Sequence, residues 1–104
     1  MSIRKVKSLK IGSVRYNIFR AEKIADRDDA LGVVKYASGE IGISTDHTSV
    51  DVEATTMMHE AVHALYWQAG VKKHDERMIE VLSGMLIRFI QDNPQFIKAI
   101  QELK

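Results

Sequence analysis

Two histidines stand four residues apart inside the longest helical pattern of this chain. The segment is His59-Glu60-Ala-Val-His63, and neither proline nor glycine interrupts the helical spacing from about residue 49 to residue 69. Because residues i and i+4 share one face of an α-helix, both imidazoles point toward one place. The pair can therefore share one ligand, whereas the alternative is two solvent-facing or core histidines on either side of an ordinary helix glutamate.

The residue types in this segment favour a zinc ion as the ligand. Neutral imidazole nitrogens bind zinc readily, and a chain without cysteine can hold zinc only through histidine and carboxylate. Glu60 lies about 100° around the helix from His59, so it can reach a zinc-activated water without being a ligand. The spacing thus predicts two metal ligands, His59 and His63, and one general base, Glu60.

A third ligand is expected downstream, because catalytic zinc usually keeps three protein ligands and one open position. Glu76 and Glu80 are the candidates, one turn apart on a second predicted helix that the short connection at residues 70–73 folds back against the first. Relative to an apolar stripe centred near Met78 and Leu82, Glu80 faces water more squarely. The pattern favours Glu76 and leaves Glu80 open.

The hydrophobic period changes at about residue 48. Before it lie short runs rich in β-branched and aromatic residues, at 14–19, 33–36 and 41–43, which predict a small antiparallel sheet within residues 6–44. The Ser38-Gly39 turn makes residues 33–44 a predicted hairpin. After it, a period of 3.6 predicts helices at about 49–69, 75–92 and 94–103. The expected fold is α+β, with residues 1–104 forming a single domain.

End signals and apolar stripes accompany each predicted helix. Thr48 with Asp51 resembles a capping box, Gly70 ends the first helix, and Asn93 with Pro94 begins the third. The stripes expected to face the core are Ala54, Met58, Ala61 and Leu65 in the first helix, Met78, Val81, Leu82, Met85 and Phe89 in the second, and Phe96, Ile97, Ile100 and Leu103 in the third.

Composition excludes several classes of function. The net charge is +1, no apolar run approaches the length of a membrane span, and the first residues lack the apolar stretch of a secretory signal. Positive residues gather near the N-terminus without a groove-entering helix or stacking aromatics, so nucleic-acid binding is not expected. The chain is predicted to be cytoplasmic, without a membrane partner, and its methionines Met57, Met58 and Met85 offer a surface for a homodimer.

A family resemblance rests on three stretches of the sequence: His59-Glu60-Ala-Val-His63-Ala-Leu, Asp75-Glu76-Arg-Met-Ile79-Glu-Val-Leu82-Ser83, and Asp92-Asn93-Pro94. Over residues 33–94 the chain resembles the small zincin-like proteins encoded by bacteriophages and prophages, which are similar to the ImmA/IrrE-type zinc metallopeptidases with their HExxH motif. The resemblance implies a minimal zincin-like fold, zinc as the cofactor and a protein or peptide substrate. It also implies Glu76 as the third ligand.

Two functions follow from these patterns. The first is a zinc metallopeptidase with Glu60 as the base, in which Tyr66 stabilises the oxyanion and the strand at residues 39–44 pairs with an extended substrate that approaches closely at Gly42. The alternative is a zinc-binding, zincin-fold module for protein interaction, with little or no proteolytic activity. Glu60 favours the enzyme, because a purely structural zinc site needs no base.

Overall fold

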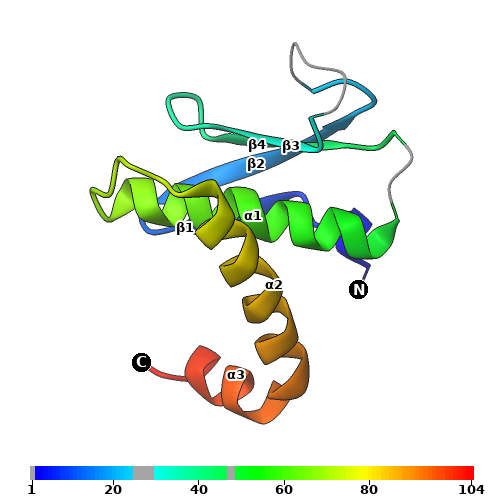
Figure 1. Cartoon of the computed structure of the whole chain (residues 1–104). Helices are drawn as coiled ribbons and strands as arrows, with labels where there is room; N and C mark the ends of the chain where they lie inside the picture. Colours follow the sequence, from blue (N-terminus) through cyan, green and yellow to red (C-terminus); the bar gives the residue numbers. More distant parts are fainter. Residues whose placement is uncertain (1, 25–29, 47–48) are drawn as a thin grey trace.

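A four-stranded sheet precedes three helices in the computed structural model, which describes residues 2–24, 30–46 and 49–104 (Figure 1). The predicted α+β class is confirmed. In chain order the elements are η1 (Ile3–Lys5), β1 (Ser8–Ile11), β2 (Val14–Ala21), β3 (Gly32–Lys35), β4 (Glu40–Ser44), α1 (Val50–Gln68), α2 (Glu76–Asp92) and α3 (Pro94–Gln101).

The sheet consists of two hairpins and has the strand order β1-β2-β4-β3. Each hairpin is antiparallel and has a glycine with positive φ at its turn, Gly12 at 60° and Gly39 at 67°. The expected hairpin at residues 33–44 is therefore present. The prediction of a purely antiparallel sheet is wrong in one respect, because β4 returns beside β2 in a parallel pair, with Ile18 opposite Ile41. This crossover leaves β3 at an edge of the sheet.

Helix α1 lies across one face of the sheet, and the core forms between them (Figure 1). Ile41 and Ile43 of β4 are fully buried against the face of α1 that carries Met57, Ala61 and Ala64. The predicted stripe is only partly right: Ala61 belongs to this core, whereas Leu65 is 49% exposed. The core face is thus rotated toward Met57 and Ala64, whose small or flexible side chains let α1 approach the sheet closely.

Side chains at the helix starts fix where α1 and α2 begin. Ser49 Oγ accepts a hydrogen bond from the backbone N–H of Val52 at 3.2 Å, so Ser49 is the N-cap of α1. Thr48, the predicted cap, lies outside the described residues. Asp75 caps α2 by accepting from two backbone N–H groups of its first turn. These caps satisfy donors that have no partner within the helix.

A buried carboxylate ties the start of the chain to α1. The Glu53 side chain is 3% exposed and accepts from Arg4 Nε at 2.6 Å and from Arg20 Nε at 3.2 Å. Burial acts to raise the pKa of Glu53, but the hydrogen bonds and charges of the two arginines outweigh it and hold that pKa below its ordinary value. Arg20 also donates to backbone carbonyls of Ile3 and Val6, which connects η1 to the sheet.

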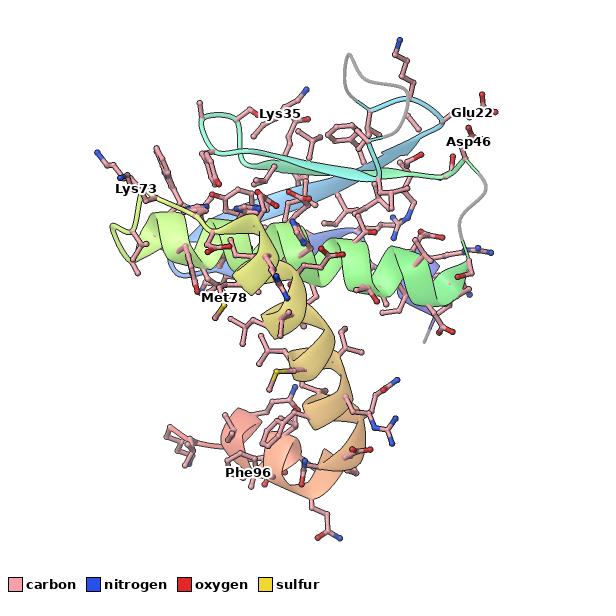
Figure 2. All side chains as sticks on the ribbon, viewed as in Figure 1. Glu22, Lys35, Asp46, Lys73, Met78 and Phe96 are labelled. Carbon is pink, nitrogen blue, oxygen red and sulfur yellow. The ribbon has the colours of Figure 1, made fainter. Side chains whose placement is uncertain are left out.

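Helix α2 contacts α1 near its start and then projects away from the sheet, with α3 at its far end (Figure 1). Only Ile79 and Ser83 of α2 are buried. The apolar stripes predicted to face the core are largely exposed, for example Met85 at 64% and Phe96 at 54%. Figure 2 shows Met78 and Phe96 on these projecting helices. The physical reason is that α1 reaches only the first turns of α2, so in the part of the chain that the structure describes the far end of the stripe meets only α3, where the Phe89 and Phe96 ring centroids are 6.0 Å apart.

None of the described helices has the combination of length and apolar character that crossing a bilayer requires.

Candidate metal centre

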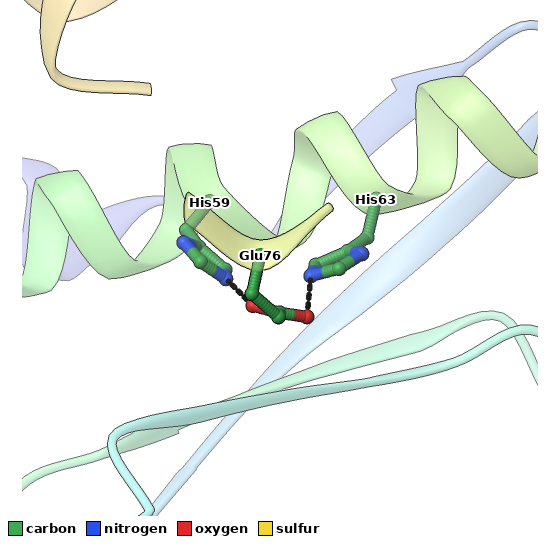
Figure 3. A group of neighbouring side chains, drawn as sticks. All are labelled: His59, His63 and Glu76. Carbon is green, nitrogen blue, oxygen red and sulfur yellow. Dashed lines mark hydrogen bonds and ion pairs between the residues drawn. The ribbon is translucent and has the colours of Figure 1, made fainter. Parts of the chain in front are cut away.

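Three predicted ligands converge at the junction of α1 and α2 (Figure 3). His59 and His63 stand one turn apart on α1, and Glu76 is the first residue of α2. One carboxylate oxygen of Glu76 lies 2.8 Å from His63 Nε2, and the other lies 3.1 Å from His59 Nε2. A ligand atom from each residue lies within 4.8 Å of the other two. The chain therefore has a His-His-Glu group that can hold a metal ion.

The turn between the helices brings Glu76 to this place. Gly70 has a positive φ of 82°, and the N–H of Val71 donates to the Tyr66 carbonyl at 2.9 Å, which reverses the chain after α1. Ile79 and Ser83 then pack against α1, and Glu76 shares their face of α2 through i, i+3 and i+7 spacing. Glu80 lies outside the His-His-Glu group.

The donor atoms fit a metal ion chemically. Imidazole lone pairs and carboxylate oxygens are all acceptors, so they come this close only when protons or a cation lie between them. Burial lowers the pKa of His63, an effect that the nearby Glu76 opposes and that His59 and His74 reinforce, and the net result favours the neutral imidazole that binds metal. Two imidazole nitrogens and one carboxylate form a ligand set typical of zinc.

Glu60 lies next to this group without belonging to it. It is 8% exposed, and burial raises the pKa of its carboxyl to about 7, although the charge of His59 lowers it and that of Glu76 raises it further. Across from it, a Cβ built on Gly32 would lie 2.9 Å from Glu60 Oε2 and 2.6 Å from a methyl carbon of Thr56. The missing side chain at Gly32 therefore lets β3 pass close to Glu60.

An open groove of about 1050 Å³ runs between β3 and α1 past the three ligands. Its charged lining side chains, apart from the histidines, are all acidic: Asp51, Glu60, Glu76 and Glu80. In an antiparallel pair the outward and inward backbone groups alternate, and Ser44 N–H donates to the Leu31 carbonyl at 2.8 Å. The N–H and C=O groups of Gly32 and Val34 therefore point away from β4, at the open edge of the sheet.

The strand predicted to accompany a substrate is not the one at this edge. Residues 39–44 contribute β4, but β4 is an interior strand paired on both sides. A Cβ on Gly42 would meet the Phe19 ring at 2.4 Å and Val33 at 2.9 Å, so Gly42 makes room for side chains of neighbouring strands and not for a substrate. The prediction for Gly42 is therefore wrong, and the edge strand that lines the groove is β3.

Two tyrosines occupy different positions relative to the groove. Tyr66 packs edge-on against the ring of His74, with centroids 5.4 Å apart, and its proposed catalytic role stays a prediction. Tyr36 lines the groove and stacks on Trp67, with centroids 4.4 Å apart. Burial, together with the charge of Glu60, raises the pKa of Tyr36 and keeps its hydroxyl a donor. The sequence carried no signal for Tyr36, because only tertiary packing brings it to the site.

A third histidine, His74, contacts His63 on the side of the ring that faces away from Glu76. His63 Nδ1 lies 2.7 Å from His74 Nδ1, on the ring edge opposite to the Nε2 that faces Glu76. His74 Nε2 lies 2.7 Å from the carbonyl oxygen of Val71. The sequence placed His74 next to the start of α2 without indicating this contact.

Comparison with known proteins identifies no family for this chain: no protein-family model, curated protein or solved structure matches it. The metal centre therefore rests on its own geometry.

Proposed function

We propose that this chain is a zinc-dependent peptidase whose metal is held by His59, His63 and Glu76. The observation that carries the proposal is the position of Glu60, a buried carboxylate that shares the groove with the three ligands but stands outside their group. A site that only stabilises the fold has no use for such a base. The resemblance to ImmA/IrrE-type peptidases supports the same reading.

Glu60 moves the protons of the proposed reaction. A zinc ion held by His59, His63 and Glu76 would supply Lewis acidity toward a peptide carbonyl and would make a water nucleophilic near neutral pH. Glu60 takes one proton as the water oxygen bonds to the carbonyl carbon, and it gives that proton to the amide nitrogen as the C–N bond breaks. The products are a carboxylic acid and an amine, and Glu60 regains its starting state.

The edge of β3 offers a place for the substrate. The outward backbone groups of Gly32 and Val34 lie along the groove and can pair with an extended peptide, as an added strand does. Such pairing would carry the scissile bond past Glu60. The Tyr36 hydroxyl lines the same groove and is a candidate donor to the developing oxyanion, next to the earlier candidate Tyr66.

A second candidate function is a zinc-binding module for protein interaction. The observation in its favour is the exposed apolar surface of α2 and α3, where Met85 and Phe96 are both more than half exposed. In this reading the metal would stabilise the junction of α1 and α2, and Glu60 would have no catalytic role.

Cleavage of a proteome-derived peptide library distinguishes the two functions. The zinc-loaded wild-type chain is compared with Glu60→Gln and with Glu80→Gln, a matched control that removes a carboxylate from the same groove outside the ligand group. We expect zinc-dependent cleavage by the wild type and by Glu80→Gln. Cleavage by Glu60→Gln should fall by about 10²- to 10⁴-fold, with zinc retained.

Two results would contradict the peptidase. One is equal cleavage by Glu60→Gln and the wild type, which would remove the base from the mechanism. The other is a zinc-loaded wild-type chain that cleaves nothing in the library, which would favour the interaction module.

A further inference from the structure

His63 has two ring nitrogens with different neighbours. Its Nε2 faces the Glu76 carboxylate, and its Nδ1 faces His74 Nδ1 at 2.7 Å. The ring centroids of His63 and His74 are 4.9 Å apart and their planes differ by 26°, so the facing nitrogens lie between the centroids. The two rings therefore meet edge to edge, which is the arrangement in which an N–H of one ring can point at the lone pair of the other.

The carbonyl of Val71 fixes the direction of this hydrogen bond. A carbonyl oxygen can only accept, so His74 Nε2, 2.7 Å away, must carry a hydrogen. In a neutral His74 the lone pair then resides on Nδ1, where it faces His63. A histidine that binds metal through Nε2 carries its one ring hydrogen on Nδ1 and needs an acceptor for it. His74 Nδ1 is that acceptor.

We propose that His74 is a positioning residue for the metal ligand His63, acting as the middle of a hydrogen-bonded chain from His63 Nδ1–H through His74 to the Val71 carbonyl. The inference rests on the proposed metal site and adds to it. The chain holds the His63 ring with its Nε2 lone pair toward His59 and Glu76, and it increases the basicity of that nitrogen. Without His74, the ring would have to be oriented on binding.

The surroundings of His74 keep it in place. The Val71 N–H donates to the Tyr66 carbonyl at 2.9 Å, which fixes the residue whose carbonyl orients His74. The Tyr66 ring packs against His74 with an interplanar angle of 86°. On the other side of His74 the chain enters α2 through the Asp75 cap. Tyr66 is thereby linked to the metal site through His74 as well as through its own backbone.

Three substitutions of His74 distinguish the effect of its hydrogen-bond acceptor from the effect of its aromatic ring. His74→Phe keeps an aromatic ring beside Tyr66 but removes the acceptor. His74→Asn removes the ring but keeps an acceptor, since its Oδ1 stands as many bonds from Cα as His74 Nδ1 does. His74→Ala removes both. Lys73→Ala, an exposed change in the same loop, is the control. Zinc dissociation constants are measured on the full chain by competition with a chromophoric chelator, and circular dichroism of the metal-free chains confirms folding.

We expect His74→Phe and His74→Ala to weaken zinc binding by about 10- to 100-fold, the range seen when an outer partner of a metal ligand is lost. His74→Asn should bind zinc more tightly than either, and Lys73→Ala should match the wild type. Equal affinities of His74→Asn and His74→Ala would overturn the role of His74, and so would wild-type affinity in His74→Phe. If His74→Phe does not fold, the comparison of Asn with Ala still decides. A wild-type chain that binds no zinc overturns the metal site and this inference together. Equal zinc affinities of His74→Asn and His74→Ala overturn only the role of His74 and leave the proposed metal site unaffected.

Discussion

Replacing Glu60 by glutamine should stabilise the metal-free chain at pH 8, although it removes the proposed catalytic base. The Glu60 carboxyl is 8% exposed and burial raises its pKa from an ordinary 4.5 to about 7. A difference of this size corresponds to about 3 kcal/mol between the two protonation states. In the metal-free chain, ionised Glu60 therefore lowers the free energy of unfolding by an amount that glutamine, which does not ionise, avoids.

The sign of the effect follows from proton binding. Between pH 4.5 and about 7 the folded chain holds a proton on Glu60 that the unfolded chain has released, so the free energy of unfolding falls as pH rises. Above about pH 7 both states are ionised and this contribution levels off. The stability of Glu60→Gln minus that of the wild type should therefore rise by about 3 kcal/mol from pH 4.5 to pH 8.

Urea denaturation at a series of pH values, with EDTA present, measures this difference. Glu80→Gln is the matched control, because it makes the same change in charge on an exposed side chain of the same groove and should alter stability by only about 0.5 kcal/mol. The same pH dependence in Glu60→Gln and Glu80→Gln would refute the reasoning, as would a Glu60→Gln chain that is less stable than the wild type at pH 8.

Three further predictions concern the core, the groove and the exposed helices. Glu53→Gln should lower the free energy of unfolding by about 1 to 2 kcal/mol at pH 7, because it removes the buried charge that accepts from Arg20 and from the half-exposed Arg4. Since the pKa of Glu53 is lowered in the fold, this loss should shrink in denaturation curves as the pH falls from about 4.5 through the lowered pKa of the folded chain, and a constant loss would contradict the ion pair. Peptides with lysine or arginine should be cleaved in preference to acidic ones, and the double change Asp51→Asn with Glu80→Gln should reduce that preference, because both carboxylates line the groove. An unchanged preference would exclude this charge effect. The homodimer surface predicted from the sequence is wrong for Met57, which is 5% exposed in the core, so a homodimer should instead use the exposed apolar side chains of α2. Phe89→Glu should then yield a monomer in light scattering, and a wild-type chain that is already monomeric would exclude the homodimer.

The two candidate metal ligands on α1 were predictable because their relation is local. His59 and His63 stay on one helix face in any fold that forms the helix, so only the presence of α1 was required. Glu76 needed a tertiary assumption, namely that α2 folds back after Gly70. It was correct because the turn, the Asp75 cap and the buried face of Ile79 act together.

The parts that the sequence did not predict depend on neighbours distant along the chain. Hydrophobic periodicity shows which residues of α2 share a face, but not whether another element covers that face, so Met85 was expected in the core and is exposed. Gly42 and Gly32 both permit close contact, but only the strand order shows that Gly32 faces Glu60. Tyr36 follows β3, and it lines the groove only because the β3–β4 hairpin packs next to α1, an element that comes later in the sequence.

Zinc binding to the purified chain and to two carboxylate variants tests the central claim most directly. The metal-free protein is titrated with zinc and the bound metal is quantified by elemental analysis. With His59, His63 and Glu76 as the ligands, the wild type and Glu80→Ala should each bind one zinc ion per chain, and Glu76→Ala should bind it much more weakly. A wild-type chain that binds no zinc would contradict the claim. So would a Glu76→Ala chain that binds zinc as tightly as the wild type while Glu80→Ala does not.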